Sequence, residues 1–305
     1  MTAASERHNT DIAQTFQIEG LDVRGRLVRL GPALDQVLDA HGYPEAVSAM
    51  LAQTLTLAVT LASALKYEGI FTLQVQSDGP ISLLVADITS AGAVRGYARF
   101  DEDRVAEVED GDGADVPRLL GQGHLAFTVD QGQDMERYQG IAELDGATLA
   151  DCAHHYFRNS EQLETAIFLT AQPFDDDRNR MRAGAMMVQR MPHQKADETD
   201  VEDGWRRAVA LLASLSEDEL LDESLDHDAL IYRLYHEDGV RAFNAHDIFH
   251  QCRCSRDKVA NTLKSFPRTD VTGDDGTASV VCEFCKADYT FTPGDLDDLY
   301  GPSDA

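Results

Sequence analysis

Four of the five cysteines in this chain of 305 residues stand in two close pairs near its C-terminus. Cys252 and Cys254 are separated by one residue, Cys282 and Cys285 by two, and 27 residues lie between the pairs. Four thiolates in two pairs suit tetrahedral zinc, which binds sulfur at about 2.3 Å. The sequence therefore predicts one zinc ion held by these four cysteines and a small fold organised around it.

The zinc-binding segment is predicted to be a C-terminal helix–hairpin domain over residues 229–305. Leu230, Ile231, Leu234 and Tyr235 form a helical stripe, and Ser255 is the expected N-cap of a second helix over residues 255–265. Two short strands are expected around VVCEFC and DYTFT. A unit of roughly 70 residues has a marginal hydrophobic core, so a metal cross-link is expected to stabilise it.

Residues 1–190 are predicted to form a mixed α/β core domain. Pro44 to Lys66 carries apolar residues at helical spacing, which indicates a long helix. Strands followed directly by strands favour an α+β arrangement over a doubly wound one. The expected strands are Leu21–Leu30, Phe71–Val75, Ile81–Ile88, Val94–Phe100 and Leu125–Val129.

Residues 191–228 are predicted to be a helical, acidic linker. From His193 to Asp228 there are twelve acidic residues and three basic ones, while Trp205, Val209 and Leu212 keep helical spacing. The charged residues indicate a solvated helix face, and their mutual repulsion also predicts helices that unfold easily. These two interpretations are compatible.

The net charge of −28 limits the partners that this chain is expected to bind. Such an acidic surface repels polyanions, so neither nucleic acid nor an anionic membrane is expected as a partner. The first residues lack the basic and apolar segments of a secretory signal, and no apolar run approaches 18 residues. Clustered thiols in a chain with few cysteines favour a reducing, cytoplasmic location.

The cysteine cluster leaves several interpretations open. A purely structural zinc site is one of them. A disulfide across Cys252 and Cys254 would close a small, strained ring and be readily reduced again, which is typical of a reversible redox switch. Basic residues flank the cysteines and would lower the pKa of the thiols once metal is lost; they are Arg253, Arg256, Lys258 and Lys286.

Two other classes of protein also use such cysteines. One is a zinc-ribbon interaction module of a transcription- or translation-associated factor, and the other is a thiol oxidoreductase. Residues 250–290 carry six basic and six acidic side chains, so no basic stripe is available for nucleic acid. An oxidoreductase needs its CxxC motif at the start of a helix, whereas a hairpin is predicted here.

The segments HQCRCSRDKVANTL and VVCEFCKADYTF resemble the zinc-binding redox switch of the redox-regulated 33-kilodalton heat-shock chaperone family. The resemblance continues in FTLQVQSDGPISLLVADITSAGAVRGYARF, LLGQGHLAFTVDQGQDMERYQGI and HHYFRNSEQLETAIFL. This chain departs from the family in a short segment between the cysteine pairs, and in Lys286, where the family often has Gly.

The resemblance implies an ATP-independent holdase chaperone and not an enzyme. Zinc on the four cysteines would keep the reduced protein inactive. Oxidation would form the disulfides Cys252–Cys254 and Cys282–Cys285, release zinc and unfold the small domain and linker. The active form would be a homodimer that binds unfolding client proteins. The absence of a GxxxxGK[ST] loop agrees with independence from ATP.

Other candidate residues carry weaker signals. Cys152 lies near His154 and His155, but that spacing on a helix does not guarantee contact, so Cys152 is expected to be a buried residue without chemistry. His246 and His250 precede the first cysteine pair. They are not expected to bind the metal, because four thiolates already complete its shell.

Overall fold

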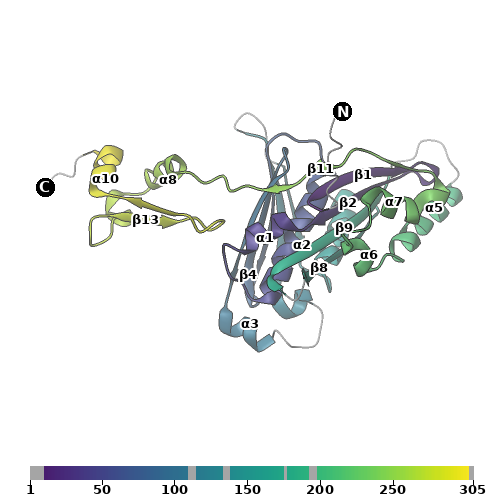
Figure 1. Cartoon of the computed structure of the whole chain (residues 1–305), viewed down its shortest axis with the longest axis horizontal. Coiled ribbons are helices and arrows are strands. Elements are labelled where there is room, and N and C mark those ends of the chain that lie inside the picture. The colour runs from purple at the N-terminus through teal and green to yellow at the C-terminus, as the bar shows by residue number, and fades with distance from the viewer. Residues whose placement is uncertain (1–9, 109–114, 133–137, 175–176, 192–197, 302–305) are drawn as a thin grey trace. The chain divides into compact units, whose positions relative to one another are not determined.

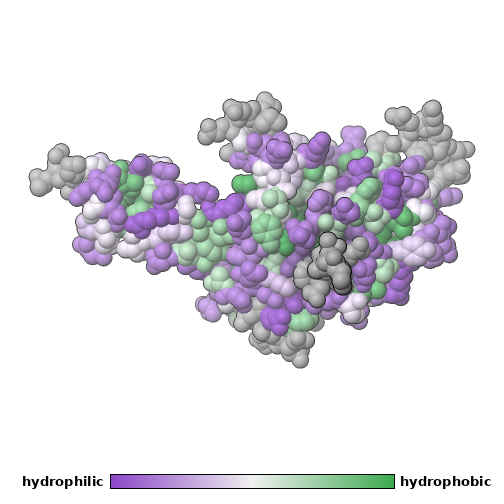
Figure 2. Space-filling view, turned by 45° about the horizontal axis from the view of Figure 1, so that its top comes forward, coloured by the Kyte–Doolittle hydropathy of each residue, from purple (hydrophilic) through white to green (hydrophobic). Residues whose placement is uncertain are grey.

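The computed structural model describes residues 10–108, 115–132, 138–174, 177–191 and 198–301. The chain divides into two compact units, Met1–His250 and Gln251–Ala305 (Figure 1). The face seen in Figure 2 is largely hydrophilic, with hydrophobic residues scattered among the hydrophilic ones. Each unit is described by itself.

The first unit contains two six-stranded sheets among its described residues. The strands of the first sheet run in the order β10-β1-β2-β9-β8, and β11 pairs with the end of β1. Their bounds are β1 Ile12–Ile18, β2 Val23–Leu30, β8 Thr165–Phe174, β9 Asp177–Arg190, β10 Val240–Ala242 and β11 His246–Asp247.

The second sheet has the order β12-β5-β4-β3-β6-β7. All of its pairs are antiparallel except that of β12 with β5. Its strands are β3 Ile70–Ser77, β4 Ile81–Thr89, β5 Ala93–Phe100, β6 Gly123–Asp130, β7 Tyr138–Glu143 and β12 Phe249–His250. The strands expected from the sequence are present, and the α+β fold class is confirmed.

Helix α2 (Glu45–Ala62) contacts strands of both sheets and forms the centre of the first unit. It is long and apolar enough to cross a membrane by composition alone, yet 78 % of it is buried inside the fold, as expected of a core helix. Its buried threonines Thr54, Thr56 and Thr60 each donate a hydrogen bond to the carbonyl four residues earlier, so no hydroxyl is left unpaired.

Shorter helices surround this centre. They are α1 (Pro32–Leu38), α3 (Glu102–Val108) and α4 (Leu149–Tyr156). Short helical turns lie at Glu19–Leu21, Val116–Leu120, Phe157–Glu161 and His236–Asp238.

Three helices cover the face of the first sheet that is turned away from α2: α5 (Glu198–Leu212), α6 (Glu217–Leu221) and α7 (His227–Tyr235). Their apolar residues join those of the sheet in one cluster, in which the rings of Phe16 and Tyr235 stack 5.6 Å apart. We call these helices with their connections, residues 198–235, the linker helices. Their buried apolar residues are Ala208, Leu212, Leu215, Leu220, Leu230, Ile231 and Tyr235.

The second unit contains α8 (Arg256–Leu263), α9 (Arg268–Val271), the hairpin of β13 (Ala278–Val281) and β14 (Asp288–Phe291), and α10 (Pro293–Tyr300). The predicted helix and hairpin are therefore present. The buried core of this unit consists of Leu263, Ala278, Phe291 and Leu296. So small a core supplies little stability, which favours a metal cross-link.

The division between the units differs from the expected domain boundary at residue 229. Residues 229–250 pack with the first unit, because α7 contributes to the cluster on the first sheet and β10 and β11 pair with β1. The described part of the acidic linker likewise lies on the first sheet. The predicted stripe on α7 is buried apart from the half-buried Leu234, but it was assigned to the zinc-binding domain, whereas its packing partner is a strand some 200 residues earlier in the sequence.

Candidate metal centre

The first cysteine pair lies on an extended segment that ends at helix α8. Ser255 is the N-cap of that helix, and its hydroxyl accepts a hydrogen bond from the backbone N–H of Lys258, as the sequence predicted. The cap fixes where the helix begins. It thereby holds Cys254, the preceding residue, at the helix N-terminus.

The second pair occupies the turn of the β13–β14 hairpin. The N–H of Cys282 donates to the carbonyl of Ala287, and the N–H of Lys286 donates to the carbonyl of Cys282. Closing this turn requires a left-handed backbone at Lys286, whose φ is +56°. Glycine is the residue best suited to that conformation, which explains physically why Lys286 is the unusual position of the turn.

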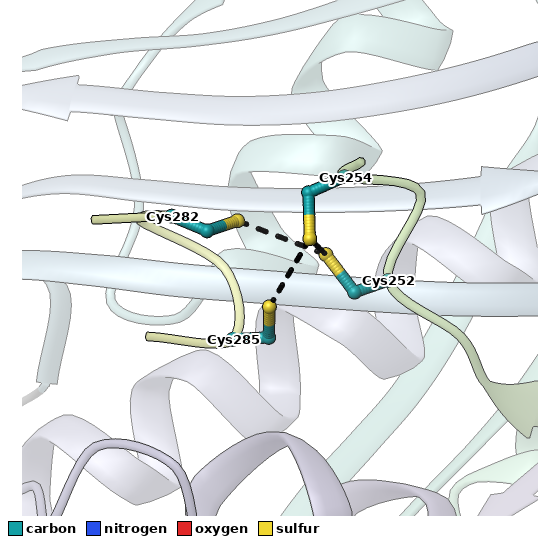
Figure 3. Close-up of side chains that lie close together, drawn as sticks. All are labelled: Cys252, Cys254, Cys282 and Cys285. Atoms are coloured by element: carbon teal, nitrogen blue, oxygen red, sulfur yellow. Dashed lines mark hydrogen bonds between the residues drawn. The ribbon is translucent and has the colours of Figure 1, made fainter. Parts of the chain in front are cut away.

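The four sulfurs converge within the second unit (Figure 3). Their Sγ atoms all lie within 4.8 Å of one another; Cys252 and Cys254 are 3.4 Å apart, Cys254 and Cys285 3.4 Å, and Cys252 and Cys282 3.8 Å. A tetrahedron with metal–sulfur bonds of 2.3 Å has edges of about 3.8 Å. The cluster therefore has the size of a tetrahedral thiolate metal site.

Electrostatics within the cluster also point to a cation. Burial tends to raise the pKa of Cys252, but hydrogen bonds from the Cys254 backbone and the neighbouring thiols lower it to about 7. Burial and hydrogen bonds with the other thiols raise the pKa of Cys285 to about 12. Ionising one thiol thus hinders ionisation of its neighbours, and four thiolates at this spacing require the positive charge of a metal ion.

Tyr289 is a member of the site that the sequence analysis missed. Its hydroxyl donates a hydrogen bond to Cys254 Sγ at 3.1 Å, and this bond, followed by burial and the nearby thiols, raises the pKa of Tyr289 to about 12. The sequence holds a weak signal for it, because strand alternation places Tyr289 on the same face as the buried Phe291. Such partners orient metal ligands and neutralise part of their charge.

Two of the flanking basic residues have partners other than the sulfurs. Arg256 donates to the Thr290 carbonyl, pairs with Asp295 at 3.0 Å and lies over the ring of Phe291. Lys258 donates to the carbonyl of Arg253 at 2.7 Å. These side chains therefore brace the fold around the cysteines.

The weaker candidates lie apart from the cluster. Cys152 is fully buried in α4, and burial raises the pKa of its thiol to about 11, so it is protonated at neutral pH. In the described part of the chain, the metal-competent group contains the four cysteines and neither His246 nor His250. Those two histidines belong to the first unit.

Comparison with known proteins decides the family. Residues 11–292 match the family model described as Hsp33 protein. The 33 kDa chaperonin of Caulobacter vibrioides is 40 % identical over 290 residues, an alignment that covers 93 % of this chain and 95 % of the relative. The 33 kDa chaperonin of Ectopseudomonas mendocina is 35 % identical and is aligned over 95 % of both chains.

The chain belongs to the Hsp33 family. Its fold resembles the crystal structure of the 33 kDa chaperonin from Thermotoga maritima, with a TM-score of 0.78, 22 % identity and coverage of 96 % of this chain and 98 % of that one. The Hsp33 match extends far beyond the cysteine pairs. It therefore disfavours both an isolated zinc ribbon and a CxxC oxidoreductase.

Proposed function

We propose that this protein is a redox-regulated, ATP-independent holdase chaperone that binds unfolding proteins under oxidative stress. Membership of the Hsp33 family supports a heat-shock chaperone. The observation that carries the redox part is the convergence of Cys252, Cys254, Cys282 and Cys285, because one cluster can either bind a metal or form disulfides.

The metal proposed for the reduced form is one zinc ion per chain. All four ligands are sulfur, and the sulfur–sulfur distances suit bonds of 2.3 Å. Bound zinc would cross-link the start of α8 to the hairpin turn and contribute on the order of 10 kcal/mol to folding. That exceeds what a core of four buried apolar residues supplies.

Oxidation is proposed to produce the disulfides Cys252–Cys254 and Cys282–Cys285. Forming each disulfide removes two electrons from a pair of thiolates, and one peroxide molecule accepts them with two protons to yield two waters. Disulfide sulfurs no longer offer thiolate ligands, so the site cannot hold zinc. Because Cys254 and Cys285 are as close as Cys252 and Cys254, peptide mapping of the oxidised protein is the direct test of the pairing.

The linker helices are the proposed second part of the switch. They cover apolar residues of the first sheet, among them Phe16, Leu27 and Met186. The chain leads from α7 through the short strands β10, β11 and β12 to Cys252, and unfolding of the second unit is proposed to propagate along this segment to the acidic linker helices. Detached helices and the uncovered sheet would then offer apolar surface to clients.

Light scattering of a heat-unfolded client tests this function. The oxidised protein is expected to suppress aggregation without ATP, and the reduced, zinc-loaded protein to have little effect. Reductant with zinc should restore the inactive form. Equal suppression by the reduced protein would contradict the switch and leave a purely structural metal site.

Two further proposals concern assembly and location. A homodimer of the oxidised form is implied by the family resemblance, and analytical ultracentrifugation before and after peroxide treatment tests it. A cytoplasmic location is proposed because a four-thiolate site needs a reducing compartment. Fractionation of cells that produce the protein is its test.

A further inference from the structure

A hollow of about 370 Å³ in the first unit concentrates positive charge. It lies between β2 and the segment that follows α2. Its described lining includes Arg24, Arg26, Lys66 and His246 and contains no Asp or Glu. In a chain with 54 acidic residues and a net charge of −28, such a local composition is unexpected.

Arg24, Arg26 and Lys66 of this hollow have no carboxylate partners within the described part of the chain. Most other arginines do, for example Arg95 with Asp87 at 2.7 Å and Arg182 with Asp35 at 3.3 Å. Arg26 is only 2 % exposed, and its Nε and Nη1 have no hydrogen-bond acceptor. The third nitrogen, Nη2, reaches the carbonyl of Ala64 at 3.5 Å, which is a long contact.

A buried cation without a countercharge is unfavourable. Burial, and then repulsion by Arg24, lowers the pKa of Arg26 to about 10. At neutral pH the guanidinium stays charged, so the hollow keeps its positive potential. An anion beside these side chains would supply the missing countercharge.

We propose that this hollow binds a small oxyanion, namely the phosphate or carboxylate group of a small molecule. Arg24 and Lys66 supply charged donors, and the hydroxyl of Thr15 and the amide of Asn244 supply neutral ones. Arg26 contributes its charge from below the surface of the hollow. The acidity of the rest of the protein selects a small anion over a polyanion.

The hollow also has room for more than the anionic group. A neighbouring hollow of about 560 Å³ shares Thr15, Ser63, Leu65, Lys66 and His246 with it. Its lining mixes apolar residues, among them Val59, Ile88 and Ile248, with polar ones, which include one carboxylate, that of Asp247. The ligand class is therefore an organic phosphate or carboxylate whose body lies along the second hollow.

A structural role for Arg26 is the alternative. The guanidinium lies near the C-terminus of α2, where a cation interacts favourably with the helix dipole. On that account Arg26 stabilises the helix end and the hollow contains only water. The two accounts predict different effects of substitution and of added anion.

The experiment titrates the reduced, metal-loaded full chain with inorganic phosphate or with acetate. Ionic strength is held constant with sodium chloride, because any salt screens a charge of −28. We expect saturable binding by calorimetry, with backbone NMR shifts confined to residues 15, 24–26, 63–66 and 243–246. Tighter binding of phosphate indicates a phosphate-bearing ligand, and tighter binding of acetate a carboxylate-bearing one.

Substitutions locate the site. Arg24→Gln with Lys66→Gln should weaken binding at least tenfold. The control, Arg206→Gln with Arg233→Gln, changes the net charge equally but on the linker helices, and it should leave binding unchanged.

Arg26→Met should keep or raise the thermal midpoint without phosphate and lose the increase that phosphate gives the wild type. Non-saturable effects, or equal binding by both double variants, would overturn the proposal. A strongly destabilised Arg26→Met protein that binds phosphate as tightly as the wild type would also overturn the proposal, because Arg26 would then serve only to stabilise the end of α2.

This test requires neither oxidation nor a client protein. Loss of anion binding and loss of redox activation are therefore separate outcomes. The Arg24→Gln/Lys66→Gln variant is expected to remain activatable by peroxide.

Discussion

At the scale of single residues, the hydroxyl of Tyr289 and the backbone of Lys286 shape the metal centre beyond its four ligands. One donates a hydrogen bond to a sulfur, and the other closes the turn that carries two of them. Lys286 acts on the ligand pair that the hairpin presents, whereas Tyr289 reaches from the hairpin to Cys254 of the first pair. Their contributions can be measured separately.

Tyr289→Phe is expected to weaken zinc binding about tenfold, because Cys254 loses its hydrogen-bond donor. Competition with a chromogenic chelator measures the affinity. Tyr300→Phe is the matched control, since its hydroxyl donates to the Leu263 carbonyl in the same unit and does not contact a sulfur. An equal loss in both variants would mean that general destabilisation, and not the bond to sulfur, sets the affinity.

Lys286→Gly is expected to stabilise the zinc-loaded second unit by up to about 1 kcal/mol, because glycine adopts a φ of +56° without strain. Lys286→Ala keeps the strain and removes the charge, so it serves as the control and should not stabilise. Thermal unfolding of the second unit, followed by the backbone NMR signals of residues 251–301, reports the difference. Stabilisation by both variants would assign the effect to the lysine charge.

Cys152→Ala should leave zinc content and peroxide activation unchanged. The thiol is buried and its pKa is raised to about 11, so it offers neither a thiolate nor access to oxidant. A small loss of stability, on the order of 1 kcal/mol, is expected from the cavity. Loss of activation in a folded variant would make Cys152 part of the switch.

At the scale of elements, Arg29 on β2 fastens the linker helices to the first sheet. It is 2 % exposed, and its guanidinium donates to the carbonyls of Leu220, Leu225 and Glu219 at 2.7, 2.5 and 3.1 Å. These carbonyls lie in and just after α6, where the helix leaves them without internal partners. The same side chain therefore completes α6 and fixes it to the sheet.

Arg29→Met is expected to destabilise the docked linker helices by about 2–4 kcal/mol, because buried carbonyls lose their donors. Arg233→Met is the control: its ion pair with Glu219 is exposed, so it should cost less than about 1 kcal/mol. Hydrogen exchange of residues 217–235 measures the loosening. We further expect reduced Arg29→Met to suppress client aggregation in part. If the amide hydrogens of residues 217–235 stayed fully protected in that variant, Arg29 would not be what holds the linker helices on the sheet.

At the scale of the whole molecule, the proposed switch depends on unequal stability. The second unit has a core of four buried apolar residues, whereas the first encloses α2 between two sheets. Loss of metal should therefore unfold the second unit and leave α2 and the two sheets of the first unit folded. The linker helices, which are strongly acidic, are expected to follow the second unit.

Hydrogen exchange after peroxide treatment should show protection lost over residues 198–301 and retained in β3–β6. Cys282→Ser with Cys285→Ser should lose the same protection without oxidant, because two of the four ligands are gone. This variant should also lack zinc and suppress client aggregation constitutively. A variant that lacks zinc yet stays protected throughout would contradict metal-dependent folding.

The sequence alone determined the features that depend on short-range pattern. The spacing of the cysteines identified the four residues that converge, and local periodicity predicted α2, α8, the hairpin, β2 and the strands β3–β6, but neither β7 nor β12 of the second sheet. These predictions succeed because a strand or helix pattern, a cap or a paired-cysteine motif is complete within a few residues.

Only the tertiary structure decided what each buried face packs against. The apolar stripe on α7 has the same spacing whether it packs in a small zinc domain or against the first sheet. Periodicity shows that a face is buried, but it does not show which element covers that face. The carbonyls that Arg29 contacts lie about 190 residues away in the sequence, and the sulfur that Tyr289 contacts lies 35 residues earlier. Such contacts depend on chain folding over long separations, which residue spacing does not encode.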